Sequence, residues 1–158
     1  MKFNDTVLKE LETITSRYPK KEAALLPALY LLEREFGTIS NEGMEYVASL
    51  LDISPAKVFG VFTFYTYYRR PGTGKYLIQL CSTLPCALRK SEFLFDHISK
   101  KLGIKNGETT PDKMFTLKKV ECLGACDRAP FLQINEDDFE HMTPEKVNFL
   151  LDELRKKQ

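Results

Sequence analysis

The sequence predicts an α/β protein in which an all-α helical-bundle domain, residues 1–72, precedes an α/β layer domain, residues 73–158. Three observations lead to this prediction. Apolar residues recur at helical spacing as far as residue 68. The proline- and glycine-rich stretch Arg69–Gly74 then breaks this period. Beyond it, apolar segments of strand character alternate with helical patterns in the order strand, helix, strand, strand, helix.

Three amphipathic helices are expected in the first third of the chain. Asp5 is the predicted cap of the first, which extends to about Tyr18 and is stopped by Pro19. The second is expected to end at Gly37, and Ser40 to open the third. Their apolar stripes are Val7, Leu8, Leu11 and Ile14; Leu25, Leu29, Leu32 and Phe36; and Met44, Val47, Leu50 and Leu51.

A fourth helix is predicted from Ser54, an N-cap residue followed by proline at the first helical position. It extends over residues 56–68, where six of thirteen residues are aromatic. Aromatic residues at helical spacing are typical of a buried bundle helix. They are also concentrated at protein interfaces. Both interpretations can hold, each for a different side of the helix.

In the second half, two predicted strands each lead to a cysteine. Tyr76–Leu80 precedes Cys81, and Met114–Val120 precedes Cys122. A helix is expected between them, beginning at Leu84–Cys86 with the stripe Leu88, Phe95, Ile98 and Leu102. A third strand, Phe131–Ile134, is followed by an acidic turn, Asn135–Asp138, and Thr143 caps a terminal helix. Together these elements make a layer domain of about the size of thioredoxin.

The composition disfavours nucleic-acid-binding and membrane-spanning proteins. The chain has 158 residues, 43% of them hydrophobic, which is enough to bury a core. Lys and Arg total 23 against 22 for Asp and Glu, so no surplus of positive charge suggests nucleic-acid binding. No apolar run approaches the roughly 18 residues of a membrane helix, and the first residues lack a signal-peptide core. We expect a cytoplasmic protein without direct membrane insertion, whose thiols stay reduced.

All four cysteines fall into two pairs, Cys81 with Cys86 and Cys122 with Cys126. Their spacing fits a structural zinc site with four cysteine ligands, a zinc staple that would stabilise a protein-interaction module. It also fits a 2Fe-2S cluster, in which each iron takes two thiolates. A domain with this much apolar structure has little need of a zinc staple, but the spacing itself leaves both open. A thioredoxin-type redox pair requires two intervening residues, but the two pairs here have four and three, which disfavours this alternative. Structural disulfides are disfavoured as well, because a reducing compartment keeps thiols reduced.

Two further expectations concern the surroundings of the sulfurs. Loops at strand ends can present backbone N–H groups to the sulfurs, and Gly124 would let the main chain approach where a side chain obstructs. Cys86, in the first turn of a helix, would have its thiolate favoured by the helix dipole.

Several segments resemble a known family. Gly107–Asp112, Phe115–Cys126 and Ala129–Pro130 are similar to the small 2Fe-2S flavoprotein-fraction subunit of NADH:quinone oxidoreductase, respiratory complex I. Its relatives serve NAD-linked hydrogenases and formate dehydrogenases. The resemblance extends to Ser54–Tyr65, to Cys81 and Cys86, and to Thr143–Glu145. It therefore covers nearly the whole chain.

The resemblance implies a helical N-terminal domain and a thioredoxin-like C-terminal domain. It implies an electron-transfer subunit whose 2Fe-2S cluster is held by Cys81, Cys86, Cys122 and Cys126. It also implies a larger partner that binds NADH and FMN and carries a 4Fe-4S cluster. This chain alone would have no complete active site and would lie peripheral to the inner membrane through the complex. Lys90 and Lys113 depart from the family pattern, because glycine is frequent at both positions.

No other catalytic or metal site is expected. His97 and His141 are interpreted as solvated or hydrogen-bonded surface histidines. The acidic residues of 136–140 lack the EF-hand ligand pattern and its central glycine. The chain has no glycine-rich phosphate loop, so nucleotide and flavin would be bound elsewhere.

Overall fold

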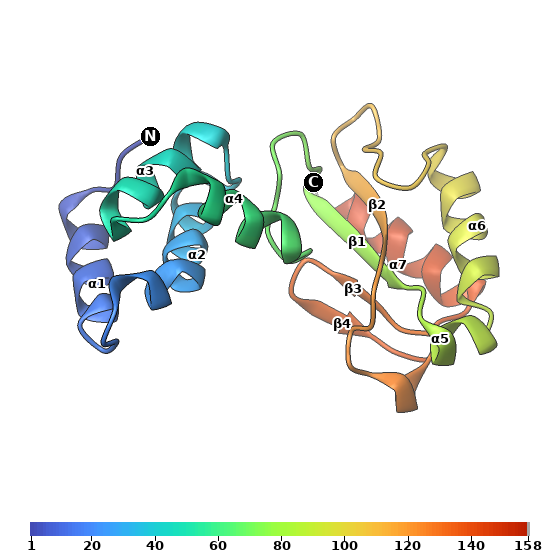
Figure 1. The fold of residues 1–158 in the computed structure, drawn as a ribbon. Coiled ribbons are helices and arrows are strands. Elements are labelled where there is room, and N and C mark those ends of the chain that lie inside the picture. The colour runs from blue at the N-terminus through green and yellow to red at the C-terminus, as the bar shows by residue number, and fades with distance from the viewer. Residues whose placement is uncertain (158) are drawn as a thin grey trace. The chain divides into compact units, whose positions relative to one another are not determined.

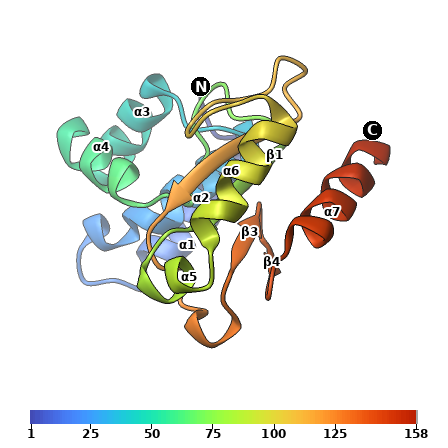
Figure 2. The same ribbon diagram turned by 90° about the vertical axis from the view of Figure 1, so that its right-hand side faces the viewer.

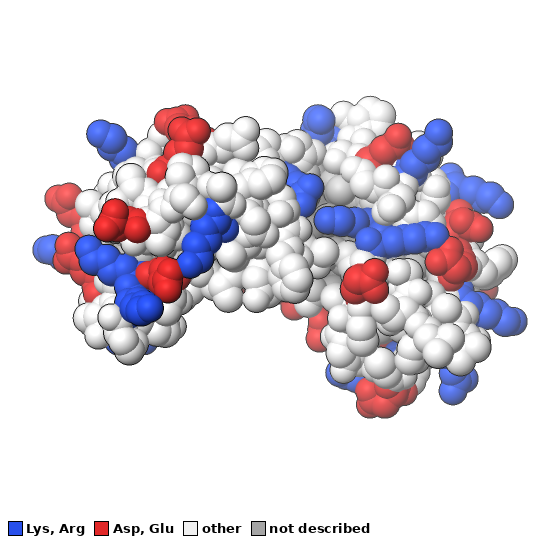
Figure 3. Space-filling model, viewed as in Figure 1, with Lys and Arg blue, Asp and Glu red and all other residues white. Residues whose placement is uncertain are grey.

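The computed structural model describes residues 1–157, which divide between Pro71 and Gly72 into two compact units (Figure 1). Each unit has its own hydrophobic core. Basic and acidic side chains are interspersed on the face of each unit shown in Figure 3, as a net charge of +1 leads one to expect.

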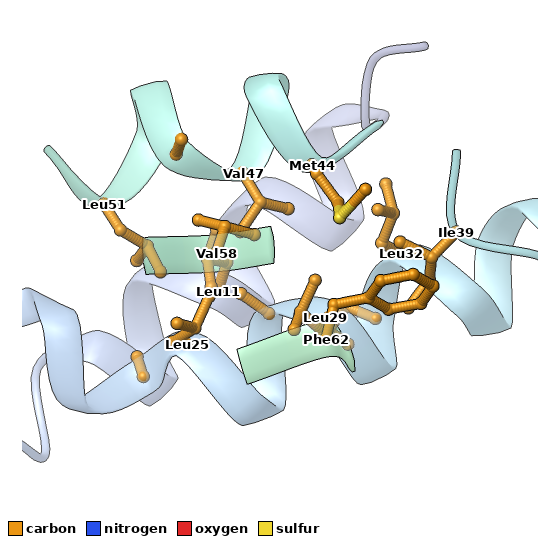
Figure 4. Close-up of a cluster of buried hydrophobic side chains, with 14 of the residues drawn as sticks. Leu11, Leu25, Leu29, Leu32, Ile39, Met44, Val47, Leu51, Val58 and Phe62 are labelled. Atoms are coloured by element: carbon orange, nitrogen blue, oxygen red, sulfur yellow. The ribbon is translucent and has the colours of Figure 1, made fainter. Parts of the chain in front are cut away.

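The N-terminal unit is entirely helical. Its elements are α1 (Asp5–Thr15), the 3-10 helix η1 (Lys21–Ala24), α2 (Leu25–Phe36), α3 (Asn41–Leu51) and α4 (Pro55–Phe64). The predicted apolar stripes converge on one core. Leu11, Leu29, Val47, Val58 and Phe62 point into it from the four α-helices (Figure 4). Gly37 ends α2 in the left-handed conformation, as predicted, with φ of 75°.

Two predicted boundaries of the first helix are wrong. The cap of α1 is Asn4 rather than Asp5, because the Asn4 carboxamide oxygen accepts a hydrogen bond from the Val7 N–H at 3.0 Å. The helix ends at Thr15 rather than near Tyr18. There the chain tightens into turns in which Arg17 and Tyr18 donate to the carbonyls three residues earlier.

The fourth helix is also shorter than predicted and ends at Phe64 instead of continuing to Tyr68. Its aromatic residues divide as the two interpretations require. Phe62 is buried, and buried Tyr68, beyond the helix, donates its hydroxyl to the Leu26 carbonyl at 3.1 Å. Phe59 and Phe64 remain 53% and 77% exposed, and Tyr65 and Tyr67 are exposed as well. We call Phe59, Phe64, Tyr65 and Tyr67 the aromatic patch.

The C-terminal unit is a four-stranded sheet with helices packed on it. Its elements are β1 (Tyr76–Cys81), α5 (Leu84–Leu88), α6 (Ser91–Leu102), β2 (Phe115–Val120), the 3-10 helix η2 (Cys126–Arg128), β3 (Leu132–Ile134), β4 (Asp137–Phe139) and α7 (Pro144–Lys156). The strand order is β2-β1-β3-β4. β1 pairs with β2 in parallel and with β3 antiparallel. α6 and α7 pack side by side on the sheet (Figure 2). His97 Nε2 and Asn148 Oδ1, 3.0 Å apart, join the two helices.

Two features of this unit differ from the prediction. The helix that was expected from Leu84 to Leu102 is broken at Lys90, which takes a left-handed conformation with φ of 69°. Leu88 therefore leaves the apolar stripe and is 75% exposed. The predicted acidic turn, Asn135–Asp138, includes the start of β4, which pairs with β3 across a turn at Asn135 and Glu136. This strand was missed because it has three residues, two of them exposed aspartates, and so shows no apolar alternation.

Within residues 1–157, no single helix has the length and apolar character needed to cross a membrane. The pair α3 and α4, bent by 120°, meets the length and composition criterion only when the two helices are taken together.

Candidate metal centre

The four cysteines converge on one end of the sheet of the C-terminal unit. Cys81 is the last residue of β1 and is aligned with Val120, the last residue of β2. Because the two strands are parallel, their carboxyl ends lie side by side, and Cys122 follows only two residues after Val120. The Ser82 N–H and hydroxyl both bond the Val120 carbonyl, at 3.0 and 3.1 Å, which ties the two strand ends together.

Cys81 is buried, and hydrogen-bond donors surround its sulfur. The Thr83 hydroxyl lies 3.1 Å from Cys81 Sγ. Burial raises the pKa of the Cys81 thiol, but hydrogen bonds from the Thr83 side chain and from the Thr83 and Leu123 backbones outweigh it and lower the pKa below its usual value. The structure thus confirms that backbone N–H groups face this sulfur. The Thr83 hydroxyl was not anticipated from the sequence.

Cys86 lies in the first turn of α5 and is also buried. Burial, followed by the neighbouring Cys81, raises the pKa of its thiol to about 11, against a smaller lowering by the Phe131 backbone. The net shift is therefore opposite in direction to the one expected from the helix dipole. α5 has only five residues, so its dipole is short, and desolvation has the larger effect.

Cys122 and Cys126 form the exposed pair. Their Sγ atoms are 3.6 Å apart, and the Gly124 N–H donates to Cys122 Sγ at 3.3 Å. The hydrogen bond with Cys122 is the main cause of a raised pKa at Cys126. Gly124 has φ of +79°, and no protein atom lies within 4 Å of a Cβ built there. Glycine is therefore favoured here by the left-handed backbone conformation, and not because another part of the protein packs against its Cα.

The arrangement is two thiol pairs set close to one another. Cys81 and Cys86 share an apolar cluster with Ala125, Ala129 and Phe131, and the charge of Cys81 contributes to the raised pKa of Cys126. Within residues 1–157, no three His, Cys, Asp or Glu side chains converge on a point where a single metal ion could sit. All four cysteines are free thiols. Four soft sulfur donors in two pairs, with N–H and O–H donors aimed at them, suit a 2Fe-2S cluster.

The other candidate residues make contacts with residues other than the four cysteines. Partly buried His97 contacts Asn148, as a hydrogen-bonded histidine should. His141 is exposed and lies with Arg89, Lys90 and Phe93 around a cavity of about 670 Å³. Glu136, Asp137 and Asp138 belong to the β3–β4 hairpin, and Glu140 follows it and pairs with Arg128 at 3.4 Å. Lys90 and Lys113, where the resemblance leads one to expect glycine, have φ of 69° and 58°, the conformation in which glycine is favoured.

Comparison with known proteins gives matches along almost the whole chain. The family model described as thioredoxin-like [2Fe-2S] ferredoxin matches residues 11–155. An NADH-quinone oxidoreductase E subunit of Rhizobium meliloti is 38% identical over 150 residues, which cover 95% of this chain and 89% of the relative. NADH-quinone oxidoreductase subunit 2 of Thermus thermophilus is 41% identical over 158 residues, covering 98% and 87%. The E subunit of the NADH-quinone oxidoreductase of Rickettsia bellii is 42% identical over 156 residues, covering 97% and 93%.

A solved structure supports the same fold. A chain of the NAD+-reducing [NiFe]-hydrogenase in its H2-reduced state superposes with a TM-score of 0.72 at 18% identity. The match covers 85% of this chain but only 22% of the hydrogenase chain, and at this identity it bears on the fold alone. The predicted α/β class with a thioredoxin-like domain is confirmed. On the family match and these relatives, the chain belongs to the thioredoxin-like [2Fe-2S] ferredoxin family.

Proposed function

We propose that Cys81, Cys86, Cys122 and Cys126 hold a 2Fe-2S cluster, with two thiolates for each iron. The observation that carries the proposal is the meeting of two thiol pairs at adjacent ends of parallel strands, with hydrogen-bond donors facing the sulfurs. When bound, such a cluster accepts and passes on one electron. This role makes the chain an electron-transfer protein with no complete active site of its own.

The residues around the sulfurs would set the properties of the centre. The Thr83 hydroxyl and the Leu123 and Gly124 N–H groups would hold the thiolates in place and stabilise their negative charge. Phe131 and Ala129 would keep water away from the buried pair. The exposed pair would leave the other side of the centre open to a redox partner.

We further propose that the chain serves as a subunit of NADH:quinone oxidoreductase, complex I. Relatives with that name are about 40% identical over nearly all of this chain, which supports this complex over an NAD-linked hydrogenase or formate dehydrogenase. The partner would be the larger subunit that binds NADH and FMN and carries a 4Fe-4S cluster. The chain would then be peripheral to the inner membrane through the complex.

The aromatic patch of the N-terminal unit is the docking element that we assign to this partner. Its four side chains are 40% to 77% exposed, although Phe62 and Tyr68 beside them are buried. Several exposed aromatic residues within one segment, residues 59–67, are typical of a protein interface. Replacing Phe64 by aspartate should therefore weaken co-purification with the partner, whereas the same change at Phe149, 70% exposed on α7, should not.

Anaerobic purification with metal and sulfide analysis tests the cluster. We expect two irons and two acid-labile sulfides per chain, with the visible absorption of a 2Fe-2S centre. One zinc and no sulfide would instead support the zinc-stapled interaction module and overturn the proposal. Serine at any of the four cysteines should lower the iron content. Ser82→Ala is the matched control, because its hydroxyl bonds the Val120 carbonyl and not a sulfur.

A further inference from the structure

The two cysteine pairs differ in how accessible they are to molecules in solution. Cys122 and Cys126 are exposed, whereas Cys81 and Cys86 each keep only 2% of their surface accessible. The exposed sulfurs are 3.6 Å apart. Residues 121–125 belong to no helix or strand, so the Cys122 sulfur can move toward Cys126 without disturbing the sheet.

We propose that Cys122 and Cys126 form a thiol–disulfide exchange site when no iron is bound, and that its reactant is a small disulfide of the glutathione type. The thiolate of one cysteine attacks a sulfur of the oxidant, giving a mixed disulfide and releasing one glutathione. The second cysteine then attacks the protein sulfur of that mixed disulfide and releases the other glutathione. Both thiol protons leave with the two glutathione molecules, the two cysteines are oxidised, and the oxidant is reduced.

The short sulfur–sulfur distance decides the outcome of the second step. Because the resolving thiol is already beside the mixed disulfide, the intramolecular attack competes effectively with any glutathione in solution. The buried pair does not share this reactivity. Cys81 and Cys86 lie within the cluster formed with Ala125, Ala129 and Phe131, which a peptide disulfide does not enter.

The disulfide would also prevent loading of the metal centre, an inference that rests on the proposed function. A disulfide between Cys122 and Cys126 removes both thiolates of one iron. The oxidised chain therefore cannot assemble the cluster until a dithiol reduces it. Disulfide formation itself requires the two thiols and the oxidant, and does not depend on whether the reduced chain is able to bind a cluster.

The test uses the full-length chain freed of iron by a chelator, with circular dichroism to confirm that it remains folded. The chain is incubated with glutathione disulfide, blocked with an alkylating agent, and mapped by mass spectrometry of its peptides. We expect a single Cys122–Cys126 disulfide and unmodified Cys81 and Cys86. Cys126→Ser should stop at a stable mixed disulfide on Cys122, because its resolving thiol is absent. The iron-loaded chain should resist oxidation.

Iron and sulfide uptake is measured on the same samples before and after dithiol treatment. Uptake that is lost on oxidation and recovered on reduction supports the full proposal. A Cys81–Cys86 disulfide, or persistent glutathione adducts in the unsubstituted chain, would overturn it. If the disulfide forms but the reduced chain takes up zinc and no sulfide, the exchange site stands and the proposed function fails.

Discussion

Replacing Gly124 by alanine should weaken retention of the cluster without unfolding the protein. Gly124 has φ of +79° and lies between the two exposed cysteines, and a Cβ there meets no protein atom within 4 Å. The left-handed conformation costs a non-glycine residue about 1–2 kcal/mol. About 0.4–1 kcal/mol of this cost is offset, because alanine has less conformational entropy than glycine to lose when the loop is ordered. The net penalty is about 1 kcal/mol, or roughly fivefold in an equilibrium constant.

The location of the strain determines which measurement detects it. The loop of residues 121–125 can relax in the iron-free chain without breaking the sheet, so the penalty falls on the cluster-bound conformation. We expect cluster loss to a chelator, followed by visible absorption, to be roughly fivefold more favourable for Gly124→Ala. The melting temperature of the iron-free chain should change little.

Gly103→Ala is the matched control. Gly103 has φ of 69° and equally open space around its Cα, but it ends α6, far along the chain from the cysteines. Here the strain cannot relax without fraying the helix, so the melting temperature should fall by about 4–8 °C for each kcal/mol. Retention of the cluster should be unchanged. Wild-type retention in Gly124→Ala, or equal loss in both variants, would refute this explanation of the loop.

Three other predictions concern the core, the titration of a buried tyrosine and the centre. Leu29→Ala, at a fully buried site in α2, should lower the free energy of unfolding by about 2–5 kcal/mol in urea titrations, whereas Leu26→Ala on the exposed side should cost under about 1 kcal/mol. Burial raises the pKa of Tyr68 to about 12, so its stabilising contribution is present below the unfolded value near 10 and is lost as the pH rises through 12. Tyr68→Phe should therefore flatten the decline of stability between about pH 10 and 12, and an equally steep decline would contradict this assignment. Thr83→Val removes the hydroxyl that faces Cys81 and should make the midpoint potential more negative, whereas Ser82→Ala should leave it unchanged.

Most elements of the fold could be predicted because their signals are local. Ser40, Ser54 and Thr143 each accept a hydrogen bond from an N–H three residues ahead, so the residue type alone marks the start of the helix. Helix boundaries were harder to predict where two neighbouring residues can both act as the cap. Asn4 and Asp5 are both good caps, and the sequence does not show that the Asn4 side chain takes the position. β4 depends on pairing with β3, and its own residues give no strand pattern.

The candidate site shows the same division. Because strand ends can be located in the sequence, the convergence of Cys81 and Cys122 follows from parallel pairing once the order of elements is known. The exposure of the two cysteine pairs could not be predicted in this way. Which pair is buried depends on where Phe131 and Ala129 pack, and these residues come from a part of the chain beyond all four cysteines. The direction of the Cys86 pKa shift therefore could not be obtained from its position in a helix.

The break at Lys90 explains how Cys86 comes to be buried beside Cys81. Arg89 N–H donates to the carbonyls of Pro85 and Cys86, and Lys90 N–H to that of Ala87, so α5 closes as a tight turn. The left-handed backbone of Lys90 then redirects the chain into α6. In a continuous helix from Leu84 to Leu102, Leu88 would face the sheet with Phe95, and Cys86 could not keep its place in a separate short turn. Because lysine has a Cβ, this turn carries a strain that glycine would avoid. The surrounding hydrogen bonds hold the conformation, so the short helix that carries Cys86 forms although a lysine occupies the left-handed position.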